Sequence, residues 1–163
     1  MAGKPIELHV PLSLAPIAAR DGMLSVLRRM TGDESHPSLS LYLSDLHVAI
    51  KGQIAVPIDI KTQERRGRWE CALKISATSD EGFFPTFSGT LSISPVGNRC
   101  GLWLMGEYLP PLGVAGELLD ATVLRHSAQR SLESLLSHIA VEILEQTNRA
   151  ESDYQRRSHQ TGD

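Results

Sequence analysis

The sequence predicts an α+β domain in which a curved antiparallel sheet wraps around one long C-terminal helix. Six short segments alternate apolar and polar residues and follow one another with short connections, as strands of an antiparallel sheet with one wet face do. A helix predicted from about 117 to 146 is the element long enough to cover the other face. A helix is only about 10 Å wide, whereas such strands are about 30 Å long, so the sheet must curl around it.

Length, charge and cysteine usage limit the class of protein. The 163 residues suit one domain, and 41% hydrophobic and 21% charged residues are ordinary for a globular chain. The net charge of -3 comes from interspersed acids and bases, which argues against a nucleic-acid partner. No stretch approaches the roughly 20 apolar residues of a membrane span, and we interpret the chain as cytoplasmic. Cys71 and Cys100 have no CxxC spacing, so two reduced thiols are favoured over a disulfide.

The N-terminal part predicts one strand followed by two short helices. Residues 6–10, IELHV, alternate apolar and polar side chains in the manner of a half-buried strand. Apolar residues then recur at helical spacing as far as Gly32. Because glycine weakens a helix interior, we expect Gly22 to divide this stretch into two helices.

Five further strands are predicted in the middle of the chain. In the first of them the apolar face changes parity near Ser44 and Asp45, which predicts a bulge or a break there. A charged turn at 64–67 joins the next two strands into a hairpin. The alternating segments cover residues 39–50, 54–60, 69–77, 87–94 and 101–108.

An abrupt corner connects the last strand to the C-terminal helix. The Pro-Pro pair at 110–111 ends strand pairing because proline has no backbone N–H, and two nearby glycines permit the chain to reverse. The sequence becomes polar after the helix. We therefore expect residues 1–147 to form a single domain and residues 148–163 to form a disordered polar tail.

The order of these elements, together with the corner GEYLPPLGVAGELLDATVLRHSAQRSLESLL, resembles the helix-grip superfamily of START domains and birch pollen allergens, called SRPBCC. The resemblance covers about residues 6 to 146, and the corner is similar to that of bacterial members. It implies a sheet of six to seven strands, two short helices after the first strand and a mostly apolar pocket under the long helix. Members of the family bind lipids, hormones or polyketides there; some are cyclases, dehydratases or oxygenase subunits, and some bind other proteins.

Small residues at inward positions favour a void inside the curled sheet. Gly89 and Gly106 occupy inward positions of two strands, and Ala121 and Ala128 occupy the apolar stripe of the helix. The candidate cavity residues share such inward positions, and they are Trp69, Phe87, Leu91, Leu104, Tyr108, Ala121, Arg125, Ala128 and Leu132.

Two of these side chains carry polar groups, and the sequence leaves two interpretations open for each. Arg125 falls within the apolar stripe, where it either snorkels outward or pairs with Glu107 or Asp120, or else anchors a ligand carboxylate. Tyr108 is expected to point inward, either as a core residue or as a ligand contact.

No motif in the sequence identifies a reaction. The chain has no phosphate loop, dinucleotide fingerprint, zinc-protease helix or serine nucleophile elbow. The six histidines are scattered, without the spacing of metal ligands. We therefore expect neither a metal nor a cofactor.

Three functions are compatible with these observations. The first is a carrier or sensor that holds an apolar or amphipathic small molecule, lipid-like or polyketide-like, between the sheet and the long helix. The second is a cyclase or dehydratase in which Tyr108 and Arg125 polarise a carbonyl group. The third is a protein-interaction module with a closed pocket. For the third, Trp103 and Met105 make the outward face of the last strand apolar, which suggests a homodimer through that face.

Overall fold

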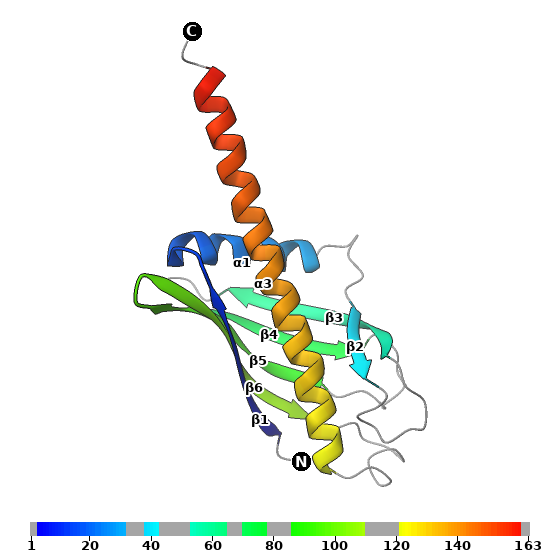
Figure 1. Cartoon of the computed structure of the whole chain (residues 1–163). Helices are drawn as coiled ribbons and strands as arrows, with labels where there is room; N and C mark the ends of the chain where they lie inside the picture. The colour runs from blue at the N-terminus through cyan, green and yellow to red at the C-terminus, as the bar shows by residue number, and fades with distance from the viewer. Residues whose placement is uncertain are drawn as a thin grey trace.

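The computed structural model describes residues 3–31, 38–42, 53–64, 70–77, 86–109 and 121–160. A strand and a helix come first, five strands follow, and a long helix ends the order of elements (Figure 1). The bounds are β1 Lys4–Leu12, α1 Pro16–Met30, β2 Ser38–Tyr42, β3 Gln53–Glu64, β4 Glu70–Ala77, β5 Thr86–Val96, β6 Arg99–Leu109 and α3 Ala121–Gln160.

The strands form one antiparallel sheet with the order β1-β6-β5-β4-β3-β2. The chain runs as a meander from β2 to β6, as the short connections predict. β1 does not join β2. It pairs with β6 instead, from Lys4 opposite Tyr108 to Leu12 opposite Cys100, and so becomes an edge strand that carries Pro5 and Pro11.

Side chains alternate between a buried inner face and a more exposed outer face of the sheet. In β6 the even positions Leu102, Leu104 and Tyr108 are buried, whereas Met105 on the other face is 51% exposed. The inner face shares one hydrophobic core with α1 and α3. The α+β class, the antiparallel sheet and the long C-terminal helix are therefore confirmed, while the bulge expected at Ser44 and Asp45 lies outside the described residues.

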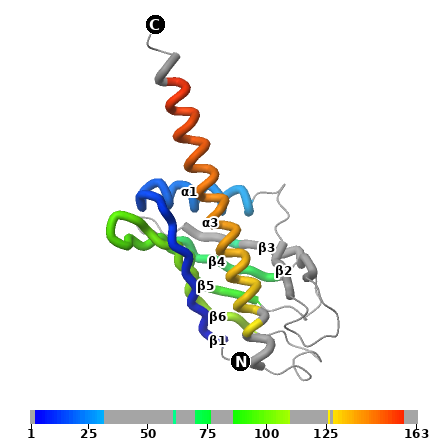
Figure 2. Tube along the Cα trace, in the orientation of Figure 1, coloured from blue at the N-terminus to red at the C-terminus, as the bar shows by residue number. Residues whose placement is uncertain are grey.

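Helix α3 lies across one face of the sheet and is held mainly at the sheet's two edges (Figures 1 and 2). Among the described residues its closest backbone approaches are to α1, β1 and β2, and its approach to the central strands is sparser. The middle of the sheet thus stands off from the helix axis. The intervening space receives side chains from the sheet, among them Phe87 and Leu91.

Helix α1 is one continuous helix of 15 residues, which corrects the expectation of two short helices divided at Gly22. Gly22 is buried against α3, where an added Cβ would lie 3.0 Å from Cγ2 of Ile143. The glycine therefore permits a close helix–helix contact and does not end a helix. An ion pair between Arg29 and Glu142 joins the same two helices.

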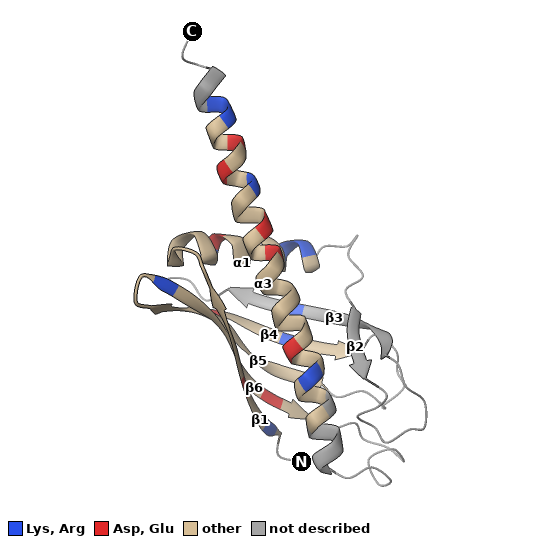
Figure 3. Ribbon diagram, in the orientation of Figure 1, with Lys and Arg blue, Asp and Glu red and all other residues tan. Residues whose placement is uncertain are grey.

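Helix α3 continues to Gln160, through residues 148–160, for which we expected a disordered tail. The side chains described from Asn148 onward are exposed, and this part projects beyond the sheet (Figure 1). Local contacts support the helix there: Arg149 pairs with Glu145 at 3.1 Å, and acidic and basic residues alternate along it (Figure 3). A polar composition suits a solvated helix as well as a tail. No helix in the described part of the chain is long and apolar enough to cross a membrane.

We expect Gly22→Val to lower the free energy of unfolding by roughly 1–3 kcal/mol, because the added side chain must push α1 away from Ile143. Equilibrium urea unfolding measures the change. Ser25→Val, on the exposed face of the same helix, is the matched control and should stay within about 0.5 kcal/mol of the parent. Equal stability of the two variants would show that the contact does not need a glycine.

Candidate ligand-binding site

A pair of glycines on neighbouring strands lies on the inner face, and one of them, Gly106, lines the candidate site. Gly89 of β5 and Gly106 of β6 lie opposite each other in the register. The same row continues to Leu73 of β4 on one side and to Ile6 of β1 on the other. The inner face therefore has large apolar residues at both ends of this row and no side chain in its middle.

A tight hairpin sets this register. β5 ends at Val96 and β6 begins at Arg99, so only Gly97 and Asn98 form the turn, and Gly97 has the positive φ of 64° that favours glycine. The length of a hairpin turn fixes which residues face each other along both strands. The turn thereby places Gly89 opposite Gly106.

The two glycines allow β5 and β6 to approach too closely for any side chain. A Cβ added to Gly89 would overlap the Met105 carbonyl oxygen, and one added to Gly106 would overlap the Ser88 carbonyl oxygen. The tip of the Phe87 ring lies over both positions, with Cζ 2.7 Å and 2.8 Å from the two hypothetical Cβ atoms. The tip of the Phe87 ring thus packs against the backbone of the two glycines.

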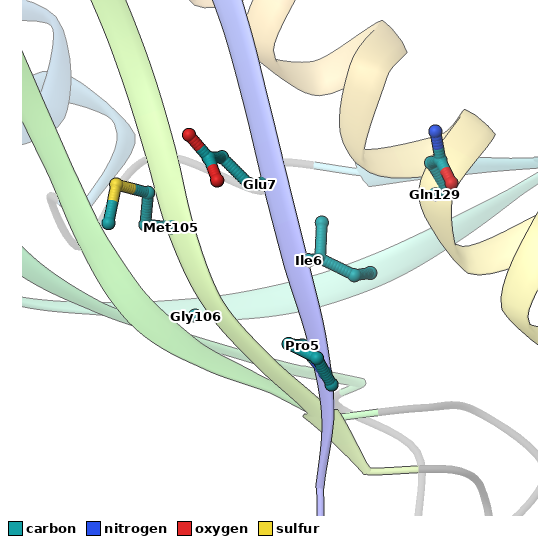
Figure 4. Close-up of a pocket in the computed structure, with 6 residues that line it drawn as sticks. All are labelled: Pro5, Ile6, Glu7, Met105, Gly106 and Gln129. Carbon is teal, nitrogen blue, oxygen red and sulfur yellow. The ribbon is translucent and has the colours of Figure 1, made fainter.

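A hollow of about 510 Å³ opens where β1, β6 and α3 meet (Figure 4). Figure 4 shows Ile6 between β1 and α3, on the side of Gln129, while Glu7 and Met105 lie on the other side of β1. Ile6 lies opposite Gly106 in the register, and both line the hollow. The lining residues are Pro5, Ile6, Glu7, Met105, Gly106 and Gln129.

The polar groups around this hollow are hydrogen-bond acceptors. The Gln129 side-chain amide donates a hydrogen bond to Oε1 of Glu133 at 2.9 Å, which leaves its carbonyl oxygen to accept another. Glu7 is exposed and carries a carboxylate. A space bordered by both apolar side chains and polar acceptors suits an amphipathic molecule.

Two buried hydroxyl groups lie in the surrounding core. Ser131 of α3 is fully buried, and its hydroxyl has no hydrogen-bond partner among the described residues. A buried hydroxyl without a hydrogen bond lowers the free energy of unfolding by about 1–3 kcal/mol. Tyr108 is 1% exposed, and its hydroxyl is buried as well. The core of this end of the molecule therefore contains polar atoms that water does not reach.

Most of the candidate cavity residues predicted from the sequence belong to this core. Tyr108 is the register partner of Phe87 on the inner face, directly beside the glycine row. The six that are buried are Phe87, Leu91, Leu104, Tyr108, Ala128 and Leu132. Trp69 lies outside the described residues, and α3 includes positions 121 and 125, although the side chains of Ala121 and Arg125 are not described. Their contact with a ligand stays a prediction.

The sequence did not indicate most of the residues around the hollow. Only Gly106 was among the small inward residues, and Gln129 had no distinguishing signal because it lies beside the apolar stripe of α3. Ile6 had a recognisable signal, since the alternation of apolar and polar residues in 6–10 places it on the inner face. Its neighbourhood depends on the pairing of β1 with β6, which no local pattern encodes.

Reactive groups are few in the part of the chain that the structure describes. No three His, Cys, Asp or Glu side chains gather there in an arrangement that would hold a metal ion. Both cysteines are buried and neither forms a disulfide, and burial raises the pKa of the Cys100 thiol, whose Sγ donates to the Leu14 carbonyl at 3.3 Å. A thiol in this condition is a packing group rather than a nucleophile.

Comparison with known proteins reveals likeness in fold. No protein-family model matches the chain, and no curated protein matches its sequence. The Zhui aromatase/cyclase from Streptomyces sp. R1128 is 14% identical with a TM-score of 0.55, over 91% of this chain and 95% of that one. A conserved protein from Geobacillus kaustophilus is 12% identical with a TM-score of 0.53, over 87% and 96%. Ara h 8.0201 is 10% identical with a TM-score of 0.51, over 88% and 99%.

We expect Gly106→Ala to lower the free energy of unfolding by roughly 2–3 kcal/mol, because the backbones of β5 and β6 must separate to admit the methyl group. Thermal and urea unfolding measure the loss. Gly97→Asn is the control, since that site has open space and asparagine tolerates its positive φ, so its cost should stay below about 1 kcal/mol. An unchanged stability for Gly106→Ala would contradict the close approach.

Proposed function

We propose that this chain, which has the helix-grip fold of the SRPBCC superfamily, binds an apolar or amphipathic small molecule between the sheet and α3. The observation that carries the proposal is the hollow between β1, β6 and α3, under a helix held at the sheet edges. A lipid-like or polyketide-like molecule is the class that suits it.

Size and lining support this class. The hollow of about 510 Å³ falls within the roughly 300–1,000 Å³ range of small-molecule pockets. Ile6 and Gly106 supply apolar surface, and the inner face beyond them consists of Phe87, Leu91 and Leu104. Burial of a hydrocarbon chain or ring against such a surface contributes about 25 cal/mol per Å².

A ligand with a polar group would also suit the adjoining core, since Ser131, two residues after Gln129 on α3, buries a hydroxyl that has no partner among the described residues, although it does not line the hollow. A ligand that offers this hydroxyl a hydrogen bond would remove the cost of leaving it without one. Arg125 remains the candidate for holding a ligand carboxylate, since α3 is helical at that position, three residues before buried Ala128. An amphipathic ligand would satisfy both groups.

We expect Ile6→Trp to weaken binding of ANS, an amphipathic fluorescent probe with an aromatic body and a sulfonate group, roughly tenfold or more, because the indole would fill the hollow, and each 1.4 kcal/mol lost is a factor of ten. The matched control is Ile17→Trp, at a side chain that is 68% exposed on α1 and should leave binding unchanged.

Native mass spectrometry of freshly purified protein completes this experiment. The proposal predicts a small adduct that disappears on denaturation and is depleted in Ile6→Trp but retained in Ile17→Trp. Equal ANS affinity of both folded variants, together with the same adduct on each, would place binding elsewhere.

A cyclase-type or dehydratase-type enzyme is the second candidate, and the buried Tyr108 hydroxyl favours it. This hydroxyl lies in an apolar core beside Phe87, where a hydrogen bond to a developing oxyanion would be strong. A relative in fold, the Zhui protein, is an aromatase/cyclase by name. In this chain, Tyr108 would polarise a substrate carbonyl, with Arg125 stabilising the enolate.

If the chain is an enzyme, Tyr108→Phe should lower turnover of a poly-β-ketone substrate by roughly a hundredfold while the substrate's dissociation constant changes little. If it is a carrier, no turnover occurs and Tyr108→Phe changes only the affinity. Single-turnover product analysis beside equilibrium binding separates the two. A turnover that Tyr108→Phe leaves intact would remove this residue from the chemistry.

A further inference from the structure

The outer face of β6 carries an apolar strip with a charge of opposite sign near each end. The residues that point outward alternate with the buried ones, and they are Arg99, Gly101, Trp103, Met105, Glu107 and Leu109. Met105 is 51% and Leu109 41% exposed, although the equivalent positions of a solvated strand are polar. This strip lies on the face of the sheet opposite to α3, and Met105 is the residue of the strip that also lines the hollow.

Trp103 lies at the centre of the strip, between His9 of β1 and short side chains of β5. Its indole stacks on His9 of β1, with ring centroids 4.7 Å apart and planes at 26°. Its Nε1 lies over Gly101, where an added Cβ would be 3.0 Å away, and has no hydrogen-bond partner among the described residues. On the other side of Trp103, β5 contributes the short uncharged side chains of Thr90, Ser92 and Ser94. An aromatic ring with short neighbours on both sides can pack face to face against another sheet.

Arg99 and Glu107 are each four positions from Trp103, on either side of it. At about 3.4 Å per residue they are about 27 Å apart, too far to pair with each other. Neither forms an ion pair with any described residue. A two-fold axis across Trp103 that turns one strip antiparallel over another would bring Arg99 of each copy to Glu107 of the partner.

The same axis matches the neighbouring strands. His9 lies opposite Trp103 in the register and therefore on the axis, so Glu7 of one copy would face Pro11 of its partner rather than another carboxylate. Ser92 of β5 is also on the axis, and Thr90 would face Ser94. On β6, Met105 would face Gly101, the position with the least side chain. No like charges face each other along β6 or β5.

The geometry points to an isologous homodimer formed by the outer faces of β1, β6 and β5, with two Arg99–Glu107 pairs between the copies. The second copy is the occupant because the strip is complementary to itself in both charge and shape, as a two-fold interface requires. The dimer goes beyond the proposed ligand binding and does not depend on it, because neither Arg99 nor Glu107, the residues of the two cross-axis pairs, lines the hollow.

Sedimentation velocity over a concentration series tests this interface. The sedimentation coefficient of the parent should correspond to a particle of twice the chain mass of 17.8 kDa. Arg99→Glu alone and Glu107→Arg alone should each raise the dimer dissociation constant roughly tenfold or more, because each places two like-charge pairs across the axis. An equimolar mixture of the two variants should dimerise again, since both cross-axis pairs are then of opposite charge. The double variant Arg99→Glu/Glu107→Arg should also be dimeric.

Lys74→Glu is the control, because it reverses an exposed charge on the same face, on β4, outside the strip. Its dissociation constant should match that of the parent. A parent that is monomeric at every concentration overturns the proposal, and so does a dimer that the charge reversals leave unchanged or that the mixture fails to restore. Arg99 and Glu107 do not line the hollow, so an ANS titration of the same variants tests the ligand proposal separately from the oligomeric state.

Discussion

The close approach of β5 and β6 at Gly89 and Gly106 is the constraint on which the rest of the fold depends. With no Cβ atoms between them, the two backbones pass so near each other that the inner face is bare there, and the Phe87 ring lies on it. Neighbouring rows carry Tyr108 on one side and Leu104 and Leu91 on the other. The row of glycines has no side chains, whereas the neighbouring rows have large ones. Helix α3 contacts the sheet mainly at its two edge strands, β1 and β2.

A second glycine positions the other half of α3. Gly22 brings α1 into contact with α3 at Ile143, and the Arg29–Glu142 pair secures the same junction. The helix is thus fixed at its middle by helix packing, while the turn that includes Gln129 borders the hollow beside Gly106. The same helix, α3, therefore packs tightly against Gly22 at Ile143 and borders the hollow at Gln129. This division explains how a chain with a continuous hydrophobic core also has room for a ligand.

Period-two alternation and one long apolar stripe were sufficient to predict the architecture, because burial on a single face leaves a periodic record in the sequence. The inward positions of Phe87, Leu91, Leu104 and Tyr108 followed from the same record. Gly22 was misinterpreted because glycine has the same local signature whether it breaks a helix or admits a neighbour. The hollow could not be predicted for a similar reason. It depends on the long-range pairing of β1 with β6, and Gln129 borders it only because of that pairing.

The two prolines of β1 have a consequence for how this molecule can assemble. Pro5 and Pro11 are both at odd positions, and a proline in a paired strand is tolerated where its missing N–H would point away from the partner. The odd positions therefore face the free edge, and only Glu7 and His9 retain donors there. A strand from another chain would find a broken hydrogen-bond ladder at this edge. Growth of the sheet by strand addition, the usual route from an open edge to a fibre, is obstructed at the first step.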